Sequence, residues 1–308
     1  MTTILFAPLQ GYTDHVYRSI HARLFKGVDA YYTPFIRIEK GEPRRQDVAR
    51  LQSPLNEGIN TVPQIIFSDA DEFRRLADIV VEAGYNEIDL NIGCPFPMQT
   101  RRGRGCALMS HPETLAAVAE QMRQMPQIKF SLKMRCGEVG ADGWRETAEA
   151  VNEMPLAQVA FHPRTGKQKY DGELAMDAFS EFLTQSKHPV IYNGDLHTPA
   201  DIADIYAKYP GIAGVMIGRG LLARPSLAEE FVSGEEWTEQ RRISALVRLN
   251  EEIGEVYERD LCGDVQILSK LRPLWDYTEP LIGRRAWKAI HKAHSLRNYH
   301  AAVAAIAD

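Results

Sequence analysis

The stretch TVPQIIFSDADEFRRLADIVVEAGYNEIDLNI, residues 61–92, predicts a strand, a helix and a second strand. Its ends, 61–67 and 86–92, are short apolar runs rich in residues that favour strands. The middle part, 69–84, has helical periodicity, opens with a capping aspartate and closes on glycine. Such a unit is typical of a parallel sheet, in which a helix must connect neighbouring strands.

The same alternation continues through about the first 220 residues and predicts eight strands. Helical patterns also cover 111–125 and 144–154, whereas 36–60 is poor in apolar residues and is predicted to be a long loop. Eight such units favour a closed (β/α)₈ TIM barrel, an α/β fold, over an open sheet. The predicted strands lie at 3–9, 30–35, 61–67, 86–92, 129–135, 158–164, 188–194 and 213–219.

The last part of the chain has a different character, because beyond residue 235 only helical patterns occur. We therefore predict a barrel domain at 1–235 and a small all-α domain at 236–308. Residues 265–300 carry seven Lys and Arg against two Asp and Glu, whereas 236–264 is acidic. A basic segment of this kind can contact phosphates, and it can equally be a solvated helical surface.

Composition excludes several classes of protein. No apolar run approaches the length of about 20 residues that a membrane helix needs. The N-terminus has no pattern of a secretory signal, so a cytoplasmic location is expected. The four cysteines form no C-x-x-C pair, so a metal site is not expected, and without an export signal disulfides are not expected either. Cys106, Cys136 and Cys262 are predicted to be buried packing residues. Nothing implies a protein partner, and a monomer is expected.

Polar or glycine-rich residues end nearly every predicted strand, which is where barrel enzymes place their active sites. Each has a structural alternative when taken alone: Lys133 as a solvated residue, His162 as a core histidine, Asn193 as part of a turn. All of them are predicted to lie at the carboxyl ends of the strands, which favours one common site. The set comprises Pro8, Leu9, Gln10, Gln64, Asn91, Cys94, Lys133, Arg135, His162, Arg164, Thr165, Asn193, Gly194, Asp195, Gly218 and Arg219.

The residue types at this rim suit a flavin with one phosphate, FMN. Gly218 and Arg219 follow the last strand, where many barrels bind phosphate. Lys133 and His162 can face the electron-rich pyrimidine side of the ring, while Gln64 and Asn193 offer amides to its edges. A dinucleotide fingerprint that follows a strand is absent from the sequence.

Six motifs, in order over about residues 5–225, resemble those of the tRNA-dihydrouridine synthases: APLQGYTD, DLNIGCP, SLKMRCG, HPRTGKQKYDG, VIYNGD and GVMIGRG. The resemblance implies FMN-dependent reduction of uridine to 5,6-dihydrouridine in tRNA, with NADPH as reductant and the helical tail as an RNA-binding domain. It implies that Cys94 is the proton donor and that Asn91 lies near the target uridine. Arg135, Arg164 and Thr165 are expected to be further substrate contacts. It assigns FMN binding to Pro8, Leu9, Gln10, Gln64, Lys133, His162, Asn193, Gly194, Asp195, Gly218 and Arg219.

The chemistry of this reaction explains why a thiol stands in the motif. Hydride from flavin N5 adds at uracil C6, and the resulting enolate needs a proton at C5. A thiol of ordinary pKa is mostly protonated at neutral pH and can donate it. Arg101, Arg102 and Arg104 would lower the thiol pKa if they were close, so we expect them to point outward to RNA phosphates. The alternative for these arginines is a mobile, solvated loop.

Three other functions are compatible with parts of the sequence. The first is a small-molecule FMN oxidoreductase of the dihydropyrimidine or dihydroorotate type, for which the basic tail has no use. The second is a flavin-free barrel that uses Lys133 as a Schiff base, and it would be colourless where a flavoprotein is yellow. The third is a non-catalytic RNA-binding barrel, which would not need Cys94.

Overall fold

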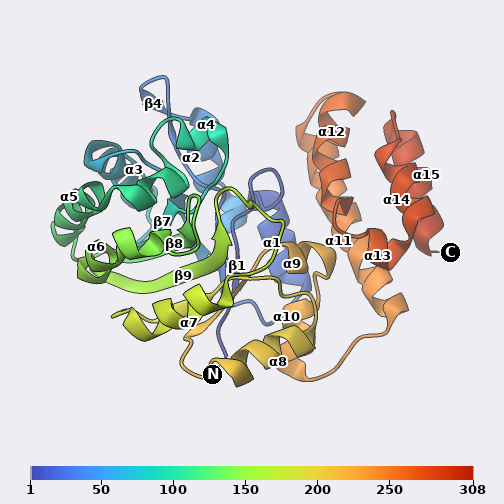
Figure 1. Ribbon diagram of the computed structural model, residues 1–308. Coiled ribbons are helices and arrows are strands. Elements are labelled where there is room, and N and C mark those ends of the chain that lie inside the picture. The colour runs from blue at the N-terminus through green and yellow to red at the C-terminus, as the bar shows by residue number, and fades with distance from the viewer. Residues whose placement is uncertain (1, 308) are drawn as a thin grey trace.

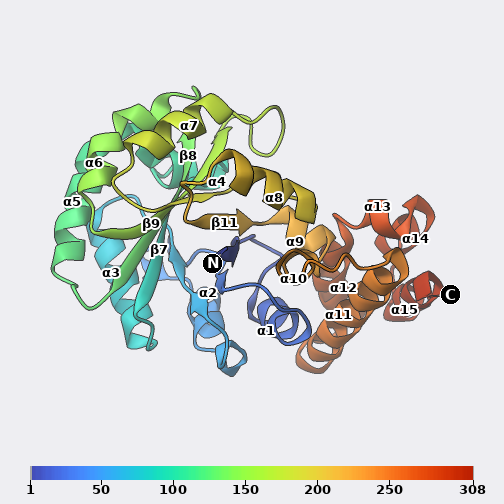
Figure 2. The ribbon, with the colours of Figure 1, turned by 90° about the horizontal axis from the view of Figure 1, so that it is seen from below.

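Parallel strands form a nearly closed barrel in the computed structural model, which describes residues 2–307 (Figures 1 and 2). The strands are β1 (Ile4–Phe6), β2 (Ala30–Tyr32), β5 (Thr61–Val62), β6 (Gln64–Ile65), β7 (Glu87–Ile92), β8 (Lys129–Gly137), β9 (Leu156–Thr165), β10 (Val190–Tyr192) and β11 (Gly214–Ile217). They are hydrogen-bonded in the order β5-β2-β1-β11-β10-β9-β8-β7-β6.

The two ends of this sheet are joined by one run of chain. β5 pairs with β2 and β6 pairs with β7, and only Pro63 separates β5 from β6. Proline has no backbone N–H to donate, so the ladder is interrupted there. The predicted (β/α)₈ barrel is therefore confirmed, with its third strand in two pieces.

Helices cover the outside of the barrel, and their apolar faces form the main core. In α3 (Ala70–Glu82), Phe73, Leu76 and Val80 are buried at helical spacing, and Asp69 caps the first turn by accepting from Glu72 N–H. The other helices of this layer are α1 (His15–Leu24), α5 (Pro112–Arg123), α6 (Ala148–Glu153), α7 (Met176–Gln185), α8 (Pro199–Lys208), α9 (Arg219–Ala223) and α10 (Leu227–Ser233).

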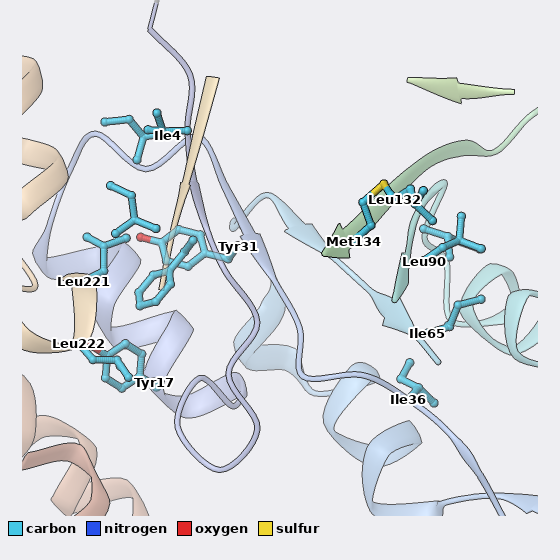
Figure 3. Packing of buried hydrophobic residues seen from close by; sticks show 14 of the residues in the cluster. Ile4, Tyr17, Tyr31, Ile36, Ile65, Leu90, Leu132, Met134, Leu221 and Leu222 are labelled. Carbon is cyan, nitrogen blue, oxygen red and sulfur yellow. The ribbon is translucent and has the colours of Figure 1, made fainter. Parts of the chain in front are cut away.

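Alternation along the strands separates this core from the barrel interior. Leu90, Leu132 and Met134 of β7 and β8 point to the helix side, close to Ile65 of β6 (Figure 3). The residues between them face inward, because successive side chains of a strand point to opposite faces. A second, smaller apolar cluster with the inward parity fills the barrel: Leu5, Ala7, Ala30, Tyr32, Val62, Ala160, Ile191 and Met216.

The segment 36–60 was wrongly predicted to be a long loop. It contains a small antiparallel pair, β3 (Ile38–Glu39) and β4 (Glu42–Pro43), then α2 (Arg45–Leu51) and the 3₁₀ helix Pro54–Asn56. Polar contacts hold it in place, since Asn56 donates to the Leu51 carbonyl and accepts from Arg18. Hydrophobic periodicity does not register elements that are held together in this way.

The predicted helical tail is also confirmed, and no strand follows β11 in residues 2–307. The tail helices stand to one side of the barrel (Figure 1, orange to red). They are α11 (Glu239–Asp260), α12 (Asp264–Leu271), α13 (Glu279–Ile282), α14 (Arg284–His291) and α15 (Leu296–Ala307). Within the described part of the chain, no helix combines the length and apolar character that a membrane crossing requires.

The tail packs directly on the barrel helix α1. Tyr257 of α11 donates to Asp14 Oδ2 at 2.7 Å, and Phe25 lies 6.3 Å from the Trp237 ring, centroid to centroid. α10 ends before Gly234, whose φ of +69° closes the helix. This turn lies beside the predicted boundary at 235, while the division into two independently folding domains stays a prediction.

Candidate active site

The inward-facing polar residues meet in a cleft at the carboxyl ends of the strands. The cleft and the open space at its mouth together enclose about 900 Å³. Among the predicted site residues, those that line it are Pro8, Leu9, Gln10, Gln64, Asn91, Cys94, Lys133, Arg135, His162, Asn193, Gly194, Asp195, Gly218 and Arg219.

Two predicted site residues, Arg164 and Thr165, are buried behind the cleft wall and do not line it. Arg164 donates to both carboxylate oxygens of Asp195, at 2.9 and 2.6 Å. The backbone N–H of Thr165 donates to Gln168 Oε1 at 2.8 Å. The geometry thus gives both residues a role in holding the rim loops, and direct contact with substrate stays a prediction.

A chain of hydrogen-bonded side chains forms the floor of the cleft. Gln64 Nε2 and Ser131 Oγ donate to the two carboxylate oxygens of Asp89, at 2.7 and 2.6 Å. Burial raises the pKa of Asp89 to about 6, although these two hydrogen bonds oppose the shift. Asn91 Nδ2 in turn donates to Gln64 Oε1 at 2.7 Å. Gln64 therefore enters the cleft as a fixed amide with one donor and one acceptor position left.

Asn91 also holds the loop that carries the thiol. Its Oδ1 accepts from the backbone N–H groups of Gly93 and Cys94, at 3.1 and 2.8 Å. Cys94 is only 8% exposed, and burial raises its thiol pKa despite the opposing hydrogen bond from the Phe96 backbone and the charges of Arg135 and Lys133. The thiol therefore keeps its proton at neutral pH.

Gly105 packs against this loop, and we expect alanine to be poorly tolerated there. Gly105 has a φ of +64°, and a Cβ added to it would collide with the Cys94 carbonyl oxygen and lie 2.9 Å from the Cys94 Cβ. Gly105→Ala should lower the free energy of unfolding by roughly 3 kcal/mol or more, since backbone strain and a collision add.

Gly103→Ala is the matched control for this substitution. Its φ of +70° is similar, but the nearest atom to an added Cβ is Ser68 Cβ at 3.9 Å, so only the backbone strain remains. Urea unfolding of both variants measures the difference. Equal losses would show that contact with the Cys94 loop contributes nothing.

Lys133 and His162 project into the cleft without a hydrogen-bond or ion-pair partner among residues 2–307. Burial, followed by the charge of Arg135, lowers the Lys133 pKa to about 8. Burial, followed by the charges of Arg135 and Lys133, holds the His162 pKa well below its ordinary value, so its imidazole is neutral. A half-buried lysine and a buried histidine without partners are groups that an anionic or carbonyl-rich ligand would satisfy.

The far side of the cleft is an ion-pair cluster around Asp195. Arg219 donates to Asp195 Oδ1 at 2.7 Å, while Arg164 holds the same carboxylate from behind. Burial opposes ionisation of Asp195, but the hydrogen bond and charge of Arg164 outweigh it and lower the pKa. The Arg219 guanidinium also lies 5.0 Å from the centre of the Tyr170 ring.

Arg135 ties two rim loops together. Its Nε donates to the Gly93 carbonyl at 2.8 Å, and its Nη1 donates to the carbonyls of Thr165 and Lys169, at 3.0 and 2.7 Å. The loop of Cys94 and the loop of Tyr170 are thereby fixed relative to each other. Arg135 lines the cleft, but its donors are largely engaged in positioning these loops, and its contact with substrate stays a prediction.

Several lining residues were not predicted to be part of the site. Tyr170 stands in the HPRTGKQKYDG motif but in a loop, where periodicity gives no position for a side chain. Pro34 and Phe35 follow β2 and are both apolar, so no polar residue marked them as part of the site. Asp89 does not line the cleft but holds Gln64 from behind, and its inward parity on β7 is the signal that could have predicted this place. The remaining additions are Ala7, Gly93, Pro95, Phe96, Leu196, His197 and Gly220.

Two further expectations were wrong. Arg104 does not point outward: it is 4% exposed and forms an ion pair with Glu72 of α3, its Nε donating at 2.9 Å. Arg101 and Arg102 are exposed, as expected. Cys262 is exposed in the turn between α11 and α12, whereas Cys106 and Cys136 are buried as predicted.

Comparison with known proteins agrees with this geometry. Residues 5–305 match the family model described as dihydrouridine synthase. A probable tRNA-dihydrouridine synthase of Treponema pallidum (strain Nichols) is 31% identical over 72% of this chain and 68% of the relative. A tRNA-dihydrouridine(16) synthase of Pseudomonas syringae pv. tomato is 30% identical over 77% of this chain and 76% of the relative.

Among solved structures, morphinone reductase has the same fold, with a TM-score of 0.52 and 13% identity over 77% of this chain and 87% of that chain. This likeness concerns the barrel fold alone. The sequence relatives and the match of the family model to nearly the whole length carry the assignment: the chain belongs to the dihydrouridine synthase family.

Proposed function

We propose that this protein is an FMN-dependent enzyme that reduces uridine in tRNA to 5,6-dihydrouridine, with NADPH as the reductant. The observation that carries the proposal is a nearly buried Cys94 thiol in one cleft with Lys133 and His162, which have no partner among residues 2–307. The relatives named as tRNA-dihydrouridine synthases support the substrate. A tRNA substrate also supports the expected cytoplasmic location.

The residues present fit FMN. Lys133 and His162 provide donors that have no partner within residues 2–307. Asn193 donates Nδ2 to the Met216 carbonyl at 2.7 Å, which leaves its Oδ1 for a ligand N–H. Gly218 and Arg219 would hold the phosphate after the last strand. When bound, the flavin would supply the hydride that uracil accepts at C6.

The chain itself would supply the proton and the geometry. The Cys94 thiol would donate its proton to C5 of the uracil, and burial keeps that thiol protonated until the proton is needed. Asn91 and Arg135 both hold the peptide unit between Gly93 and Cys94, so the backbone that carries the sulfur is fixed. Asn91 and Arg135 are therefore positioning residues, which place the thiol by holding the backbone of its loop.

The tail supports RNA over a free pyrimidine as the substrate. α14 carries Arg284, Arg285 and Lys288, which are exposed and have no ion-pair partner among residues 2–307. Cations without partners on one helix suit contacts to successive phosphates. A small-molecule reductase would have no use for this surface.

The direct test is to map dihydrouridine in cellular tRNA with and without the protein. Deleting the gene should remove dihydrouridine at one or more positions, and re-expression of the protein should restore it. Purified protein with NADPH should form dihydrouridine in tRNA from the deleted strain. If the modification persists in that strain and the purified protein leaves its tRNA unchanged, the proposal is wrong.

We expect the bound cofactor to be FMN and its retention to depend on Arg219. Arg219→Ala should lower flavin occupancy more than Arg164→Ala, because both changes remove a bond to Asp195 but only Arg219 lines the cleft. Heat release followed by chromatography identifies and quantifies the flavin. Recovery of FAD, or equal losses in the two variants, would contradict this assignment.

Flavin affinity should fall as the pH rises above about 8, the pKa of Lys133 in the ligand-free protein. Hydrogen bonds from the Lys133 ammonium to the electron-rich pyrimidine side of the flavin would raise this pKa, so the complex keeps a proton that the free protein has lost, and binding at high pH requires its uptake. One linked proton weakens affinity at most about tenfold per pH unit. Fluorescence titrations between pH 7 and 10 test this, and Lys133→Met should flatten the profile. A flat wild-type profile would exclude the linkage.

A further inference from the structure

Two large apolar side chains are exposed beside the thiol. Phe96 is 44% exposed and lines the cleft, and Met98, two residues on, is 69% exposed. In residues 2–307 the other exposed large hydrophobic residues are all valines: Val139, Val232 and Val265. An exposed aromatic ring that lines the cleft and an exposed thioether two residues further along the chain mark a contact surface.

The backbone beneath this pair is well anchored. Both residues belong to the turn and short helix α4 (Pro97–Thr100) that follow Cys94. Gln99 is 4% exposed, its N–H donates to the Phe96 carbonyl at 2.8 Å, and its own carbonyl accepts from Arg104 N–H at 3.2 Å. The ion pair of Arg104 with Glu72 fixes the far end to α3. Phe96 and Met98 are therefore displayed outward by a buried frame.

Positive charge borders the apolar pair. Arg101 and Arg102 follow α4 directly, are exposed, and have no ion-pair partner among the described residues. Most exposed arginines of the barrel helices are paired, as Arg123 is with Glu120 and Arg145 with Glu181. Apolar stacking groups next to unpaired arginines are complementary to a nucleic-acid strand, whose bases are apolar and whose phosphates are anionic.

We propose that Phe96 and Met98 form a wedge that stacks on the nucleotides next to the target uridine after it has turned out of the RNA. Arg101 and Arg102 would contact the phosphates on either side. This inference rests on the proposed function, because it presumes an RNA substrate. A uridine in folded tRNA must leave its stack to reach Cys94, and a stacking replacement offsets that cost.

The test compares two RNAs and two pairs of substitutions. Phe96→Ala/Met98→Ala should lower kcat/KM on folded tRNA by about 5- to 150-fold, the effect of losing one stacked base. The kcat/KM on a short unstructured RNA that contains uridine should fall much less, because its uracil base is already unstacked. Val139→Ala/Val232→Ala truncates two other exposed apolar side chains and should leave both rates unchanged. The single variant Met98→Ala is the most informative, because Met98 does not line the cleft and its truncation cannot disturb the flavin site directly.

A binding signal provides a readout that does not depend on turnover. With 2-aminopurine placed beside the uridine that the wild-type enzyme modifies, fluorescence should change when tRNA binds, and the wedge variant should lose that change at saturating protein. Equal losses on both RNAs, or a Met98→Ala variant that matches the control, would overturn the inference. So would altered self-association of the wedge variant with normal RNA reduction, which would assign the patch to protein contacts. A wild-type enzyme inactive on both RNAs would instead refute the proposed function.

Discussion

Cys94→Ala is expected to retain its flavin and its reduction by NADPH while losing uridine reduction by roughly 10²–10⁴-fold, the usual contribution of a general acid. The substitution removes the sulfur but keeps the backbone N–H that Asn91 holds, so the loop should stay in place. The thiol is nearly buried and protonated, and water has little access to replace it.

The step to time is the absorbance change of prereduced enzyme on mixing with RNA in a single turnover, because steady-state rates can conceal it behind product release. Cys106→Ala is the control: its side chain is 1% exposed, and its backbone bond to the Cys94 carbonyl survives the change. It should lose about 1 kcal/mol of stability and keep its rate. If Cys94→Ala matches wild type in this step, another group supplies the proton and Cys94 is a structural residue.

Much of the barrel and its rim could be predicted, and β8 shows why. In KFSLKMR the polar residues Lys133 and Arg135 alternate with apolar Leu132 and Met134, and a period of two assigns the polar pair to one face. Strand topology then brings that face into the barrel together with His162 of β9. The local pattern and the fold lead to the same placement, so these residues could be assigned to the barrel interior from one sequence.

Residues that depend on distant partners could not be placed in this way. Asp89 has inward parity, but the bonds that make it a buried network come from Gln64 and Ser131, 25 and 42 residues away. Arg104 lies in a run of exposed-looking arginines and is buried only because Glu72 of α3 reaches it. Tyr170 is positioned by a loop that Arg135 holds. No local periodicity records such contacts.

The packing of the tail on the barrel could not be predicted either, and this packing decides how the role of the tail in RNA binding should be tested. Its helices were predicted from periodicity, but not how closely α11 packs on the barrel. Leu246, Leu249 and Ile253 of α11 belong to the same core as the barrel helices, and Glu252 pairs with Arg23 of α1. Removing residues 236–308 would expose this core, so loss of RNA binding in a truncated chain would not separate misfolding from lost contacts. Surface substitutions in the full chain avoid that ambiguity.

Replacing Arg284, Arg285 and Lys288 of α14 with alanine should weaken tRNA binding by about 10- to 100-fold at physiological salt and leave the fold intact. All three side chains are exposed and form no ion pair or hydrogen bond with the described residues, so no such contact is lost. If each one neutralises a phosphate, the plot of log K against log salt concentration should become shallower by about 3 in total. Flavin content and NADPH oxidation should not change, because α14 contributes nothing to the cleft.

The matched control for α14 removes three exposed cations from the barrel helices and neighbouring loops: Arg123→Ala, Arg145→Ala and Lys187→Ala. Net charge changes equally in both triple variants, so a general electrostatic effect would weaken both alike. If α14 makes specific phosphate contacts, only the α14 variant should bind tRNA more weakly and with a smaller dependence on salt. Binding curves at several salt concentrations, read by filter retention or anisotropy, distinguish the two outcomes. An α14 variant with wild-type affinity and slope would mean that this basic helix is only a solvated surface, and the RNA would then have to be held mainly by the barrel rim, where Arg101 and Arg102 stand.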